Sequence, residues 1–394
     1  MAEGETTLSG LLDADDTRLM RDALSKLGVQ SHQEAATLHI SGCSGHFPMR
    51  EASLFLGNAG TAFRSLTAAL AFSGGCYQLD GVARMRERPI GDLVDALNVL
   101  GARIRYSGML GFPPLVIEPA DRLSSDRVSI RADISSQFLS GLLMAAPLIA
   151  PDHGLRIDVE GTLISEPYVE LTVALMRRFG VVVTRELDQY VVPRAQYRSP
   201  SHLVVEGDAS SASYFLALGA IARGPVRVDG VGRESVQGDV RFAAVLADMR
   251  ARVEFGEHHI EASGPADGGL RAIDVDCNHI PDAAMTLAMA ALFADAPSTL
   301  RNIGSWRVKE TDRISAMATE LRKVGAEVEE GTDWIRITPP TQFREATIDT
   351  YDDHRMAMCF SLVAAAGVPV HIRNPQCVTK TFPDYFDRLA ELAR

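Results

Sequence analysis

The sequence of 394 residues has few cysteines and no pair of them in close succession. The five cysteines, Cys43, Cys76, Cys277, Cys359 and Cys377, are widely spaced and form no Cys-x-x-Cys motif. Small secreted domains carry dense cysteines in even number, and structural zinc sites carry them in pairs. We therefore expect a cytoplasmic protein, in a reducing compartment, without a disulfide framework and without a structural zinc ion.

The sequence also lacks a long apolar run and an excess of positive charge. The longest apolar stretches, 138–150 and 283–294, are short for a membrane span. The first residues, Met-Ala-Glu-Gly-Glu, have neither the basic nor the apolar region of a secretory signal. The formal net charge is −12, whereas proteins that coat nucleic acid or anionic membranes are normally basic. We expect neither nucleic acid nor a membrane as a partner.

What the sequence does contain is a repeated pattern of an amphipathic helix, a turn and a β-rich run. Apolar residues recur at helical spacing, and four copies end at a glycine, the residue expected where a helix stops with positive φ. Copies recur about every 70–80 residues, which predicts two domains of three α/β units, at 1–205 and 206–394. The expected helices span 17–28, 92–101, 170–180, 242–249, 314–325 and 385–393.

The same period predicts more chain before the first helix than the sequence holds. That helix ends at Gly28, so about 40 residues of the first unit are expected to precede Met1. We therefore expect a chain that begins with a helix, without partner strands before it, and a first unit that is incomplete. A unit of this kind would lose a strand's hydrogen bonds and expose a sheet edge, which lowers stability and invites aggregation.

Several predicted helix starts carry groups that bind anions. The loop 57–60, Gly-Asn-Ala-Gly, precedes one helix, and glycines let the backbone approach an anion that the helix dipole attracts. Three arginines in 84–88 precede a second helix, and guanidinium groups bind phosphate or carboxylate in bidentate fashion. A tight turn explains the first segment equally well, and the second segment, taken alone, is better explained as a solvated basic loop. Ser135, Ser136 and Gln137 precede a third helix, as a cap or a phosphate cradle.

Two charged segments are further candidates for functional residues. Asp282 starts an apolar helix, where the dipole favours an ionised carboxylate, as in a helix cap or a general base. His279 is close by, but two such residues are a weak metal site. Lys309 and Arg313 are four residues apart in the most charged segment and are expected to share a helix face with Glu310 beside them. A salt-bridged surface helix is the competing interpretation.

Taken together and in this order, the motifs resemble the EPSP synthase family. The matching strings are Leu-Gly-Asn-Ala-Gly-Thr-Ala, Glu-Arg-Pro-Ile-Gly, Ser-Ser-Gln-Phe-Leu, Gly-Asp-Ala-Ser-Ser-Ala-Ser-Tyr, His-Ile-Pro-Asp-Ala-Ala-Met, Arg-Val-Lys-Glu-Thr-Asp-Arg and Asp-His-Arg-Met-Ala-Met. The resemblance runs from about Leu11 to the last helix. It implies an α/β fold of two domains, each with three βαβαββ units, the first incomplete here, and substrates bound in the cleft between the domains.

The resemblance also implies an activity. The enolpyruvyl group of phosphoenolpyruvate passes to the 5-hydroxyl of shikimate 3-phosphate by addition and elimination, in a monomer without a metal or an organic cofactor. Asp282 would accept the hydroxyl proton, and Glu310 and Lys380 would act in catalysis beside it. The implied shikimate 3-phosphate ligands are Ser135, Ser136, Gln137, Ser165, Tyr168, Asp282, Ser305 and Lys309, and the implied phosphoenolpyruvate ligands are Gly60, Arg88, Gln137, Arg313, Arg355 and Lys380.

The sequence departs from the family pattern in three places. The family opens with a Lys-Ser…Arg segment whose lysine contacts both substrates; residues 1–17 do not supply it, and Lys26 is no substitute. We therefore expect weak or no activity. Ser65 replaces a proline behind the phosphoenolpyruvate pocket, which predicts weaker binding of the herbicide glyphosate. Ser305 stands where the family often has asparagine and can still donate one hydrogen bond.

Three alternatives stay open. UDP-N-acetylglucosamine enolpyruvyl transferases share the fold and the donor, but they usually carry a reactive cysteine in the loop that here spans 84–88. RNA 3′-phosphate cyclases are built of related units, but they need nucleotide chemistry, and the sequence has no Walker A loop. A homologue that binds shikimate 3-phosphate poorly and does no chemistry is the third.

Overall fold

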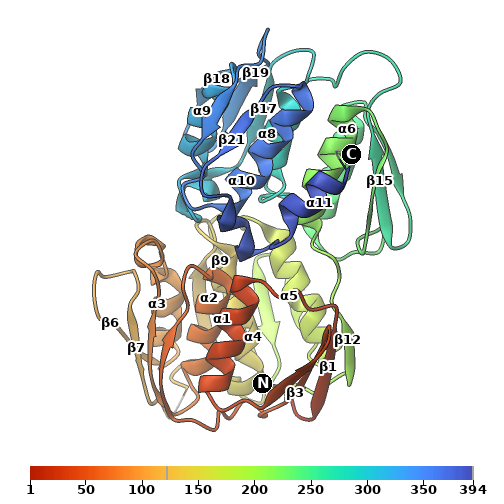
Figure 1. Ribbon diagram of the computed structural model, residues 1–394. Helices are drawn as coiled ribbons and strands as arrows, with labels where there is room; N and C mark the ends of the chain where they lie inside the picture. The colour runs from red at the N-terminus through yellow and green to blue at the C-terminus, as the bar shows by residue number, and fades with distance from the viewer. Residues whose placement is uncertain (121–122, 393–394) are drawn as a thin grey trace. The chain divides into compact units, whose positions relative to one another are not determined.

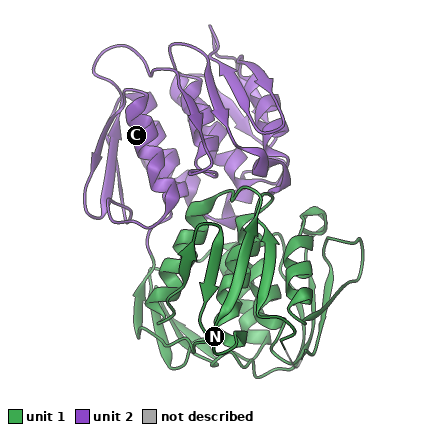
Figure 2. Cartoon of the chain, turned by 180° about the vertical axis from the view of Figure 1, so that it is seen from behind, with its two compact units in different colours: residues 1–205 green, residues 206–394 purple. Residues whose placement is uncertain are grey.

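The computed structural model describes residues 1–120 and 123–392, which fold into two compact units, Met1–Val205 and Glu206–Arg394 (Figure 2). Each unit has its own hydrophobic core. Within the described part of the chain, no helix combines the length and the apolar character that crossing a membrane would require.

Three four-stranded sheets of one topology build unit 1 (Figure 1). In each sheet the first two strands pair in parallel, and the second and fourth strands both pair with the third in antiparallel fashion. The sheets are β12-β1-β3-β2 (His202–Val204, Glu5–Ser9, Thr37–Ser41, Ser31–Glu34), β4-β5-β7-β6 (Glu51–Phe55, Cys76–Asp80, Leu115–Glu118, Arg103–Tyr106) and β8-β9-β11-β10 (Arg127–Arg131, Leu155–Glu160, Gln189–Val192, Thr184–Glu186).

Helices connect the parallel strands of the second and third sheets. The α-helices α2 (Gly60–Leu70) and α4 (Ser136–Ile149) pack against each other and bury most of their residues. The helices α1 (Asp15–Lys26), α3 (Gly91–Val99) and α5 (Glu166–Arg178) bury fewer residues. Because α2 and α4 each follow a strand that pairs in parallel with the next strand, their N-terminal ends share one side of the unit.

The prediction that the chain begins with a helix is wrong. Strand β1 precedes α1 and lies inside its sheet, with Thr7 opposite His202 of β12 on one side and His39 of β3 on the other. Its sequence, Glu-Thr-Thr-Leu-Ser, has two β-branched residues but one aliphatic side chain, so it carries little strand signal. Strand β12 comes from the far end of unit 1, and no local pattern reveals such a pairing.

Unit 2 repeats the plan with shorter strands. Helices α6 (Ala209–Ala222), α8 (Ala284–Ala291) and α10 (His354–Ser361) form its buried centre, with α8 packed on both others. Its other α-helices are α7 (Arg241–Asp248), α9 (Arg313–Lys323) and α11 (Tyr385–Leu392). The sheets are β13-β15-β14 (Val226–Asp229, His259–Ser263, Arg252–Phe255), β16-β17-β19-β18 (Asp274–Asp276, Ser298–Arg301, Ile335–Thr338, Glu327–Glu330) and β20-β21 (Ala346–Ile348, Val370–Ile372).

Short 3₁₀ helices lie in the connections between these elements. They are η1 (Met85–Glu87), η2 (Gly238–Val240), η3 (Gly304–Val308), η4 (Leu362–Ala366) and η5 (Pro375–Lys380).

The six helices predicted from the repeat are all present, as α1, α3, α5, α7, α9 and α11; the last was predicted to reach Ala393, which lies outside the described residues. The four predicted glycines, Gly28, Gly101, Gly180 and Gly325, have φ between 84° and 104°. The copy that lacks a glycine keeps the same backbone, because Arg250 after α7 has φ 72°. An exposed arginine therefore occupies a left-handed position that glycine adopts more readily.

We expect Arg250→Gly to raise the free energy of unfolding of unit 2 by about 1 kcal/mol, because glycine removes the cost of the left-handed conformation. Both tryptophans, Trp306 and Trp334, lie in unit 2, so fluorescence during urea unfolding reports on that unit. The control is Arg250→Ala, which removes the arginine side chain but keeps a Cβ atom. A gain in the alanine variant equal to that in the glycine variant would contradict the explanation.

Candidate functional site

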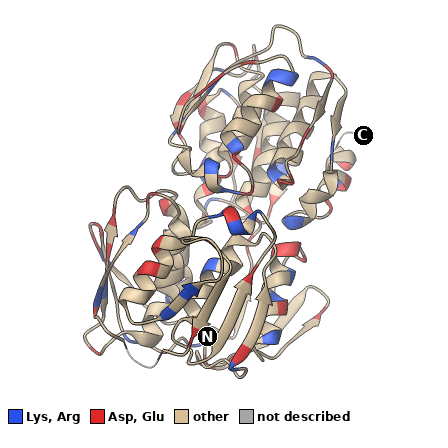
Figure 3. Cartoon of the chain, turned by 90° about the vertical axis from the view of Figure 1, so that its left-hand side faces the viewer, with Lys and Arg blue, Asp and Glu red and all other residues tan. Residues whose placement is uncertain are grey.

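Basic and acidic residues are interspersed along the ribbons of both units (Figure 3), so buried ion pairs locate the site better than a charged face does. In unit 2 the structure brings six of the predicted residues into one network of ion pairs, from the start of α8, the η3–α9 connection, the start of α10 and the end of η5. They are Asp282, Lys309, Glu310, Arg313, Arg355 and Lys380.

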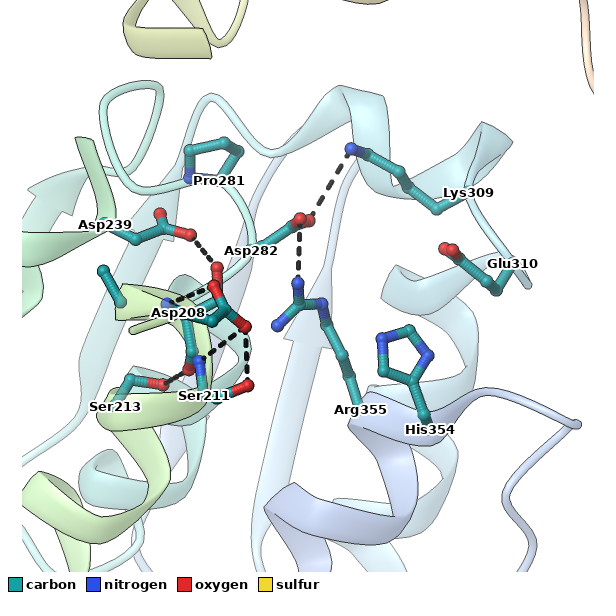
Figure 4. A network of polar contacts seen from close by, with 12 residues as sticks. Asp208, Ser211, Ser213, Asp239, Pro281, Asp282, Lys309, Glu310, His354 and Arg355 are labelled. Carbon is teal, nitrogen blue, oxygen red and sulfur yellow. Dashed lines mark hydrogen bonds and ion pairs between the residues drawn. The ribbon is translucent and has the colours of Figure 1, made fainter. Parts of the chain in front are cut away.

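Asp282 lies just before α8, and both of its carboxylate oxygens contact cations (Figure 4). Oδ1 lies 3.1 Å from Nη1 of Arg313 and 3.6 Å from Nζ of Lys309. Oδ2 accepts a hydrogen bond of 3.0 Å from Nη2 of Arg355. Burial acts to raise the pKa of Asp282, but the three cations outweigh it and hold that pKa well below its usual range.

A fully buried ion pair between Arg313 and Asp353 supports this network. Nε of Arg313 donates to Oδ2 of Asp353 at 2.7 Å, and Nη2 donates to Oδ1 at 3.2 Å. The same Nη2 donates to Glu310 at 2.9 Å. Asp353 also caps α10 by accepting a hydrogen bond of 3.0 Å from the backbone N–H of Arg355. One carboxylate therefore holds the guanidinium of Arg313 and caps the helix that carries Arg355.

The prediction that Lys309 and Arg313 share a helix face is wrong. Helix η3 ends at Val308, Lys309 is extended with ψ −152°, and α9 begins only at Arg313, capped by Asp312. The two cations still meet at Asp282, because the non-helical turn between η3 and α9 directs both toward it. The four-residue spacing therefore correctly indicated that Lys309 and Arg313 lie close together. The cause is a turn that directs both side chains to Asp282, and not a shared helix face.

Lys380 and His354 border the network near Glu310. Nζ of Lys380, at the end of η5, lies 3.9 Å from Oε1 of Glu310. His354, the first residue of α10, is buried, with Nδ1 3.4 Å from Oδ1 of Asp353. Burial lowers the pKa of His354 to about 3, so the imidazole is neutral at neutral pH. The predicted residue Ser305 lies half-buried in η3, four residues before Lys309.

Sequence reasoning missed three residues that contact this network or interact electrostatically with it. Asp353 precedes a helix and carries the signal of an N-cap, which could have identified it. The hydroxyl of Tyr214 in α6 accepts a hydrogen bond of 3.1 Å from Nη1 of Arg355. The buried carboxylate of Asp239 in η2 accepts from the hydroxyl of Ser210, and burial raises its pKa to about 6. Tyr214 ends the string Gly-Asp-Ala-Ser-Ser-Ala-Ser-Tyr, which could have identified it, whereas Asp239 has no local sequence signal.

In unit 1 a second group of predicted residues meets at the start of α2. Nη1 of Arg88 donates to the backbone carbonyl of Asn58 at 3.0 Å and to its side-chain oxygen at 3.1 Å. A Cβ atom at Gly60 would lie 2.7 Å from Nη2 of Arg88 and 2.6 Å from Nη1 of Arg64. Glycine at position 60 is therefore what lets two guanidinium groups approach the N-terminus of α2.

The predicted hydroxyl groups of unit 1 lie at the starts of α4 and α5. Ser135 caps α4 through its hydroxyl, which accepts from the backbone N–H of Gln137 at 3.3 Å. The amide of Gln137 donates to the hydroxyl of Thr61 in α2 at 3.2 Å, which joins this group to the one around Gly60. A backbone hydrogen bond of 3.2 Å from Ile164 to Ala132 ties together the loops before α5 and α4.

Three further predicted residues sit at those two helix starts. Ser136 is the buried first residue of α4. Ser165 is the buried N-cap residue of α5 and has φ 52°, a conformation that serine rarely adopts. Its carbonyl accepts from the backbone N–H of Tyr168 at 3.0 Å.

Within residues 1–120 and 123–392, no cluster of three or more His, Cys, Asp or Glu side chains could hold a metal ion.

Comparison with known proteins agrees with this geometry. A model of the family described as EPSP synthase (3-phosphoshikimate 1-carboxyvinyltransferase) matches residues 1–389. A 3-phosphoshikimate 1-carboxyvinyltransferase of Thiobacillus denitrificans is 63% identical over 398 aligned positions, which cover 100% of this chain and 92% of the relative. One from Burkholderia vietnamiensis is 60% identical over the same shares of the two chains.

Solved structures show the same fold. An EPSP synthase from Acinetobacter baumannii superposes with a TM-score of 0.79 at 25% identity, over 99% of this chain and 90% of the other. The enolpyruvyl transferase NikO from Streptomyces tendae superposes with a TM-score of 0.75 at 20% identity, over 100% and 90%. The predicted α/β fold of the enolpyruvyl transferase type is confirmed.

We expect Asp353→Asn to lower the free energy of unfolding of unit 2 by about 3 kcal/mol, because it leaves the buried Arg313 without its main counter-charge. Tryptophan fluorescence during urea unfolding measures the change. The control is Asp274→Asn, which breaks an ion pair with Arg301 in which both side chains are more than half exposed, and which should cost at most about 1 kcal/mol. Equal losses in the two variants would show that the buried pair has no special role.

Proposed function

The chain belongs to the EPSP synthase (3-phosphoshikimate 1-carboxyvinyltransferase) family, and we propose that both groups of polar residues serve its reaction. The enzyme transfers the enolpyruvyl group of phosphoenolpyruvate to the 5-hydroxyl of shikimate 3-phosphate and releases phosphate. The observation that carries the residue assignment is the convergence of four cations on two carboxylates in unit 2. Two phosphates and a carboxylate must be bound, and a buried set of cations supplies the counter-charge.

We assign the acceptor to residues at three places. The hydroxyls and amide at the starts of α4 and α5 bind the 3-phosphate and ring hydroxyls of shikimate 3-phosphate, since helix N-termini with hydroxyl groups bind phosphate. Lys309 binds the acceptor near Asp282, because its Nζ lies 3.6 Å from Oδ1 of that carboxylate. The full set is Ser135, Ser136, Gln137, Ser165, Tyr168, Asp282, Ser305 and Lys309.

The donor is assigned to the guanidinium groups and their neighbours. Arg313 and Arg355 bind anionic oxygens of phosphoenolpyruvate from unit 2, where Asp353 holds the guanidinium of Arg313 and Tyr214 accepts a hydrogen bond from that of Arg355. Arg88 binds from unit 1, where the absence of a side chain at Gly60 leaves room for it. Gln137 and Lys380 complete the set, which is Gly60, Arg88, Gln137, Arg313, Arg355 and Lys380.

The reaction needs a base that accepts the proton of the 5-hydroxyl and a second group that gives a proton to C3 of phosphoenolpyruvate and later removes one. Asp282 accepts the proton of the 5-hydroxyl as that oxygen attacks C2 of phosphoenolpyruvate, and C3 gains a proton from Lys380 or Glu310, which lie 3.9 Å apart. The resulting tetrahedral intermediate loses a proton from C3, the C2–O bond to phosphate breaks, and the enol ether forms. Groups held in place with suitable pKa values accelerate such transfers by about 10²–10⁴-fold.

Several features accompany this proposal and remain predictions. They are the closure of the two domains around the substrates, a monomeric state, a cytoplasmic location and the absence of nucleic-acid partners. A monomer follows if the residues of one chain suffice for both substrates.

The central test is release of phosphate from phosphoenolpyruvate by this chain with and without shikimate 3-phosphate. We expect phosphate release that depends on the acceptor. UDP-N-acetylglucosamine in place of shikimate 3-phosphate should give none. Asp282→Asn should reduce the rate by about 10²–10⁴-fold, because the base is lost, whereas the exposed control Asp274→Asn should change it less than about twofold. A fully active Asp282→Asn variant would refute the assignment of the base.

Gly60→Ala tests the donor assignment in unit 1. The added Cβ atom would lie closer than 3.0 Å to both Arg64 and Arg88 and would displace their guanidinium groups. We expect KM for phosphoenolpyruvate to rise about tenfold, which is about 1.4 kcal/mol of binding, with a much smaller change for shikimate 3-phosphate. Gly224→Ala is the control, because a Cβ atom there meets nothing within 4 Å. Equal effects on both substrates would argue against a donor-specific role.

A further inference from the structure

Asp282, the proposed base, is in contact with Arg313 and Arg355, the two arginines assigned to bind phosphoenolpyruvate. Arg313 contacts Oδ1 of Asp282 at 3.1 Å, and Arg355 contacts Oδ2 at 3.0 Å. Figure 4 shows Arg355 directed from α10 toward this carboxylate. A base must offer a lone pair to the proton that it accepts. Each oxygen of Asp282 already accepts a hydrogen bond from an arginine.

The two arginines differ in how firmly they are held. Arg313 is 1% exposed and contacts the carboxylates of Asp282, Glu310 and Asp353, so moving it would break several buried ion pairs. The side chain of Arg355 is 10% exposed and donates through Nη1 to the neutral hydroxyl of Tyr214. Less buried charge would be separated if Arg355 changed its partner, so Arg355 is the more exchangeable of the two.

We propose that Arg355 masks Asp282 until phosphoenolpyruvate binds. An anionic oxygen of phosphoenolpyruvate then replaces Oδ2 of Asp282 as the partner of Nη2 of Arg355. The released Oδ2 accepts the proton of the 5-hydroxyl of shikimate 3-phosphate. The inference rests on the proposed function, which makes Asp282 the base and Arg355 a donor ligand. The inference adds that Asp282 depends on Arg355. Asp282 can accept a proton only when phosphoenolpyruvate, which the hydroxyl attacks, is bound to Arg355.

The surroundings of Asp282 suit such an exchange. Tyr214 holds Nη1 of Arg355, so the guanidinium can change its partner at Nη2 without leaving the site. Lys309 and Arg313 remain at Oδ1, so the unmasked carboxylate keeps counter-charge and is not left as an isolated buried ion. The charged groups that face Asp282 or lie in contact with its partners come from η2, the η3–α9 connection, α9 and α10; they are Asp239, Lys309, Glu310, Arg313, Asp353 and Arg355.

The test is the pKa of Asp282 with and without the donor. Aspartate labelled with ¹³C at Cγ is incorporated into the full chain, and Asp282→Asn identifies the signal. The signal is titrated in free protein and in protein saturated with phosphoenolpyruvate, without shikimate 3-phosphate so that no turnover occurs. Binding is followed separately by the ³¹P signal of phosphoenolpyruvate. We expect the donor to raise the pKa of Asp282 by at least one unit, a tenfold change in proton affinity.

The negative charge of the donor would itself raise this pKa, so variants of Arg355 isolate the masking contact. In Arg355→Met or Arg355→Gln, the pKa of Asp282 without any ligand should already be at least one unit above that of the unchanged chain. Circular dichroism verifies that each variant folds. Arg373→Met is the matched control, because Arg373 is 65% exposed and pairs with Asp349 rather than with Asp282. The control should leave the pKa of Asp282 and its response to phosphoenolpyruvate unchanged.

The outcomes separate this inference from the proposed function. If phosphoenolpyruvate binds and the pKa of Asp282 does not rise, or if a folded Arg355 variant has the ligand-free pKa of the unchanged chain, masking is refuted while the donor assignment stands. If phosphoenolpyruvate does not bind at saturating concentration, the donor assignment fails and the inference fails with it. Masking is supported if phosphoenolpyruvate raises the pKa of Asp282 and if this pKa is already raised, without any ligand, in a folded Arg355 variant.

Discussion

The ion pair between Arg313 and Asp353 is the interaction on which the site in unit 2 depends. Both side chains are buried, and together they join the start of α9 to the start of α10, 40 residues later in the chain. A buried charge is tolerated only when it is paired and hydrogen-bonded. Once Asp353 holds Arg313, the remaining donors of that guanidinium are directed at Glu310 and Asp282. The positions of the assigned base and of a second carboxylate therefore follow from one pair.

The repeated α/β units explain why functional residues collect at helix starts. Gly60 begins α2, Ser135 caps α4, Ser165 precedes α5, Arg313 begins α9, and Asp282 lies just before the N-cap of α8. In a βαβ motif every connecting helix starts beyond the same edge of its sheet, so repetition of the motif brings several N-termini to one side within unit 1 and, separately, within unit 2. Unpaired N–H groups and the helix dipole attract anions there. An acidic protein with a net charge of −12 can thus present local sites for phosphate and carboxylate groups.

Two errors in the sequence reasoning have the same origin. Strand β1 was missed because its partner β12 lies almost 200 residues away and its own alternation is weak. The shared helix face of Lys309 and Arg313 was wrong because spacing alone cannot distinguish a helix from a turn that brings the same residues together. In both cases the local pattern was compatible with more than one backbone, and contacts with distant segments decided between them.

The sequence by itself determined the helices of the repeat, their glycine ends and the chemical types available for a site. Helical periodicity and the positive φ of glycine are local properties, so α1, α3, α5, α9 and α11 were predictable to within a few residues. Only the tertiary structure decided which charges meet. Arg355 contacts Tyr214 at a separation of 141 residues and Asp282 at 73, and no local pattern encodes these pairings. They depend on how α6, α8 and α10 pack, because burial makes each charge require a partner and packing determines which partner is within reach.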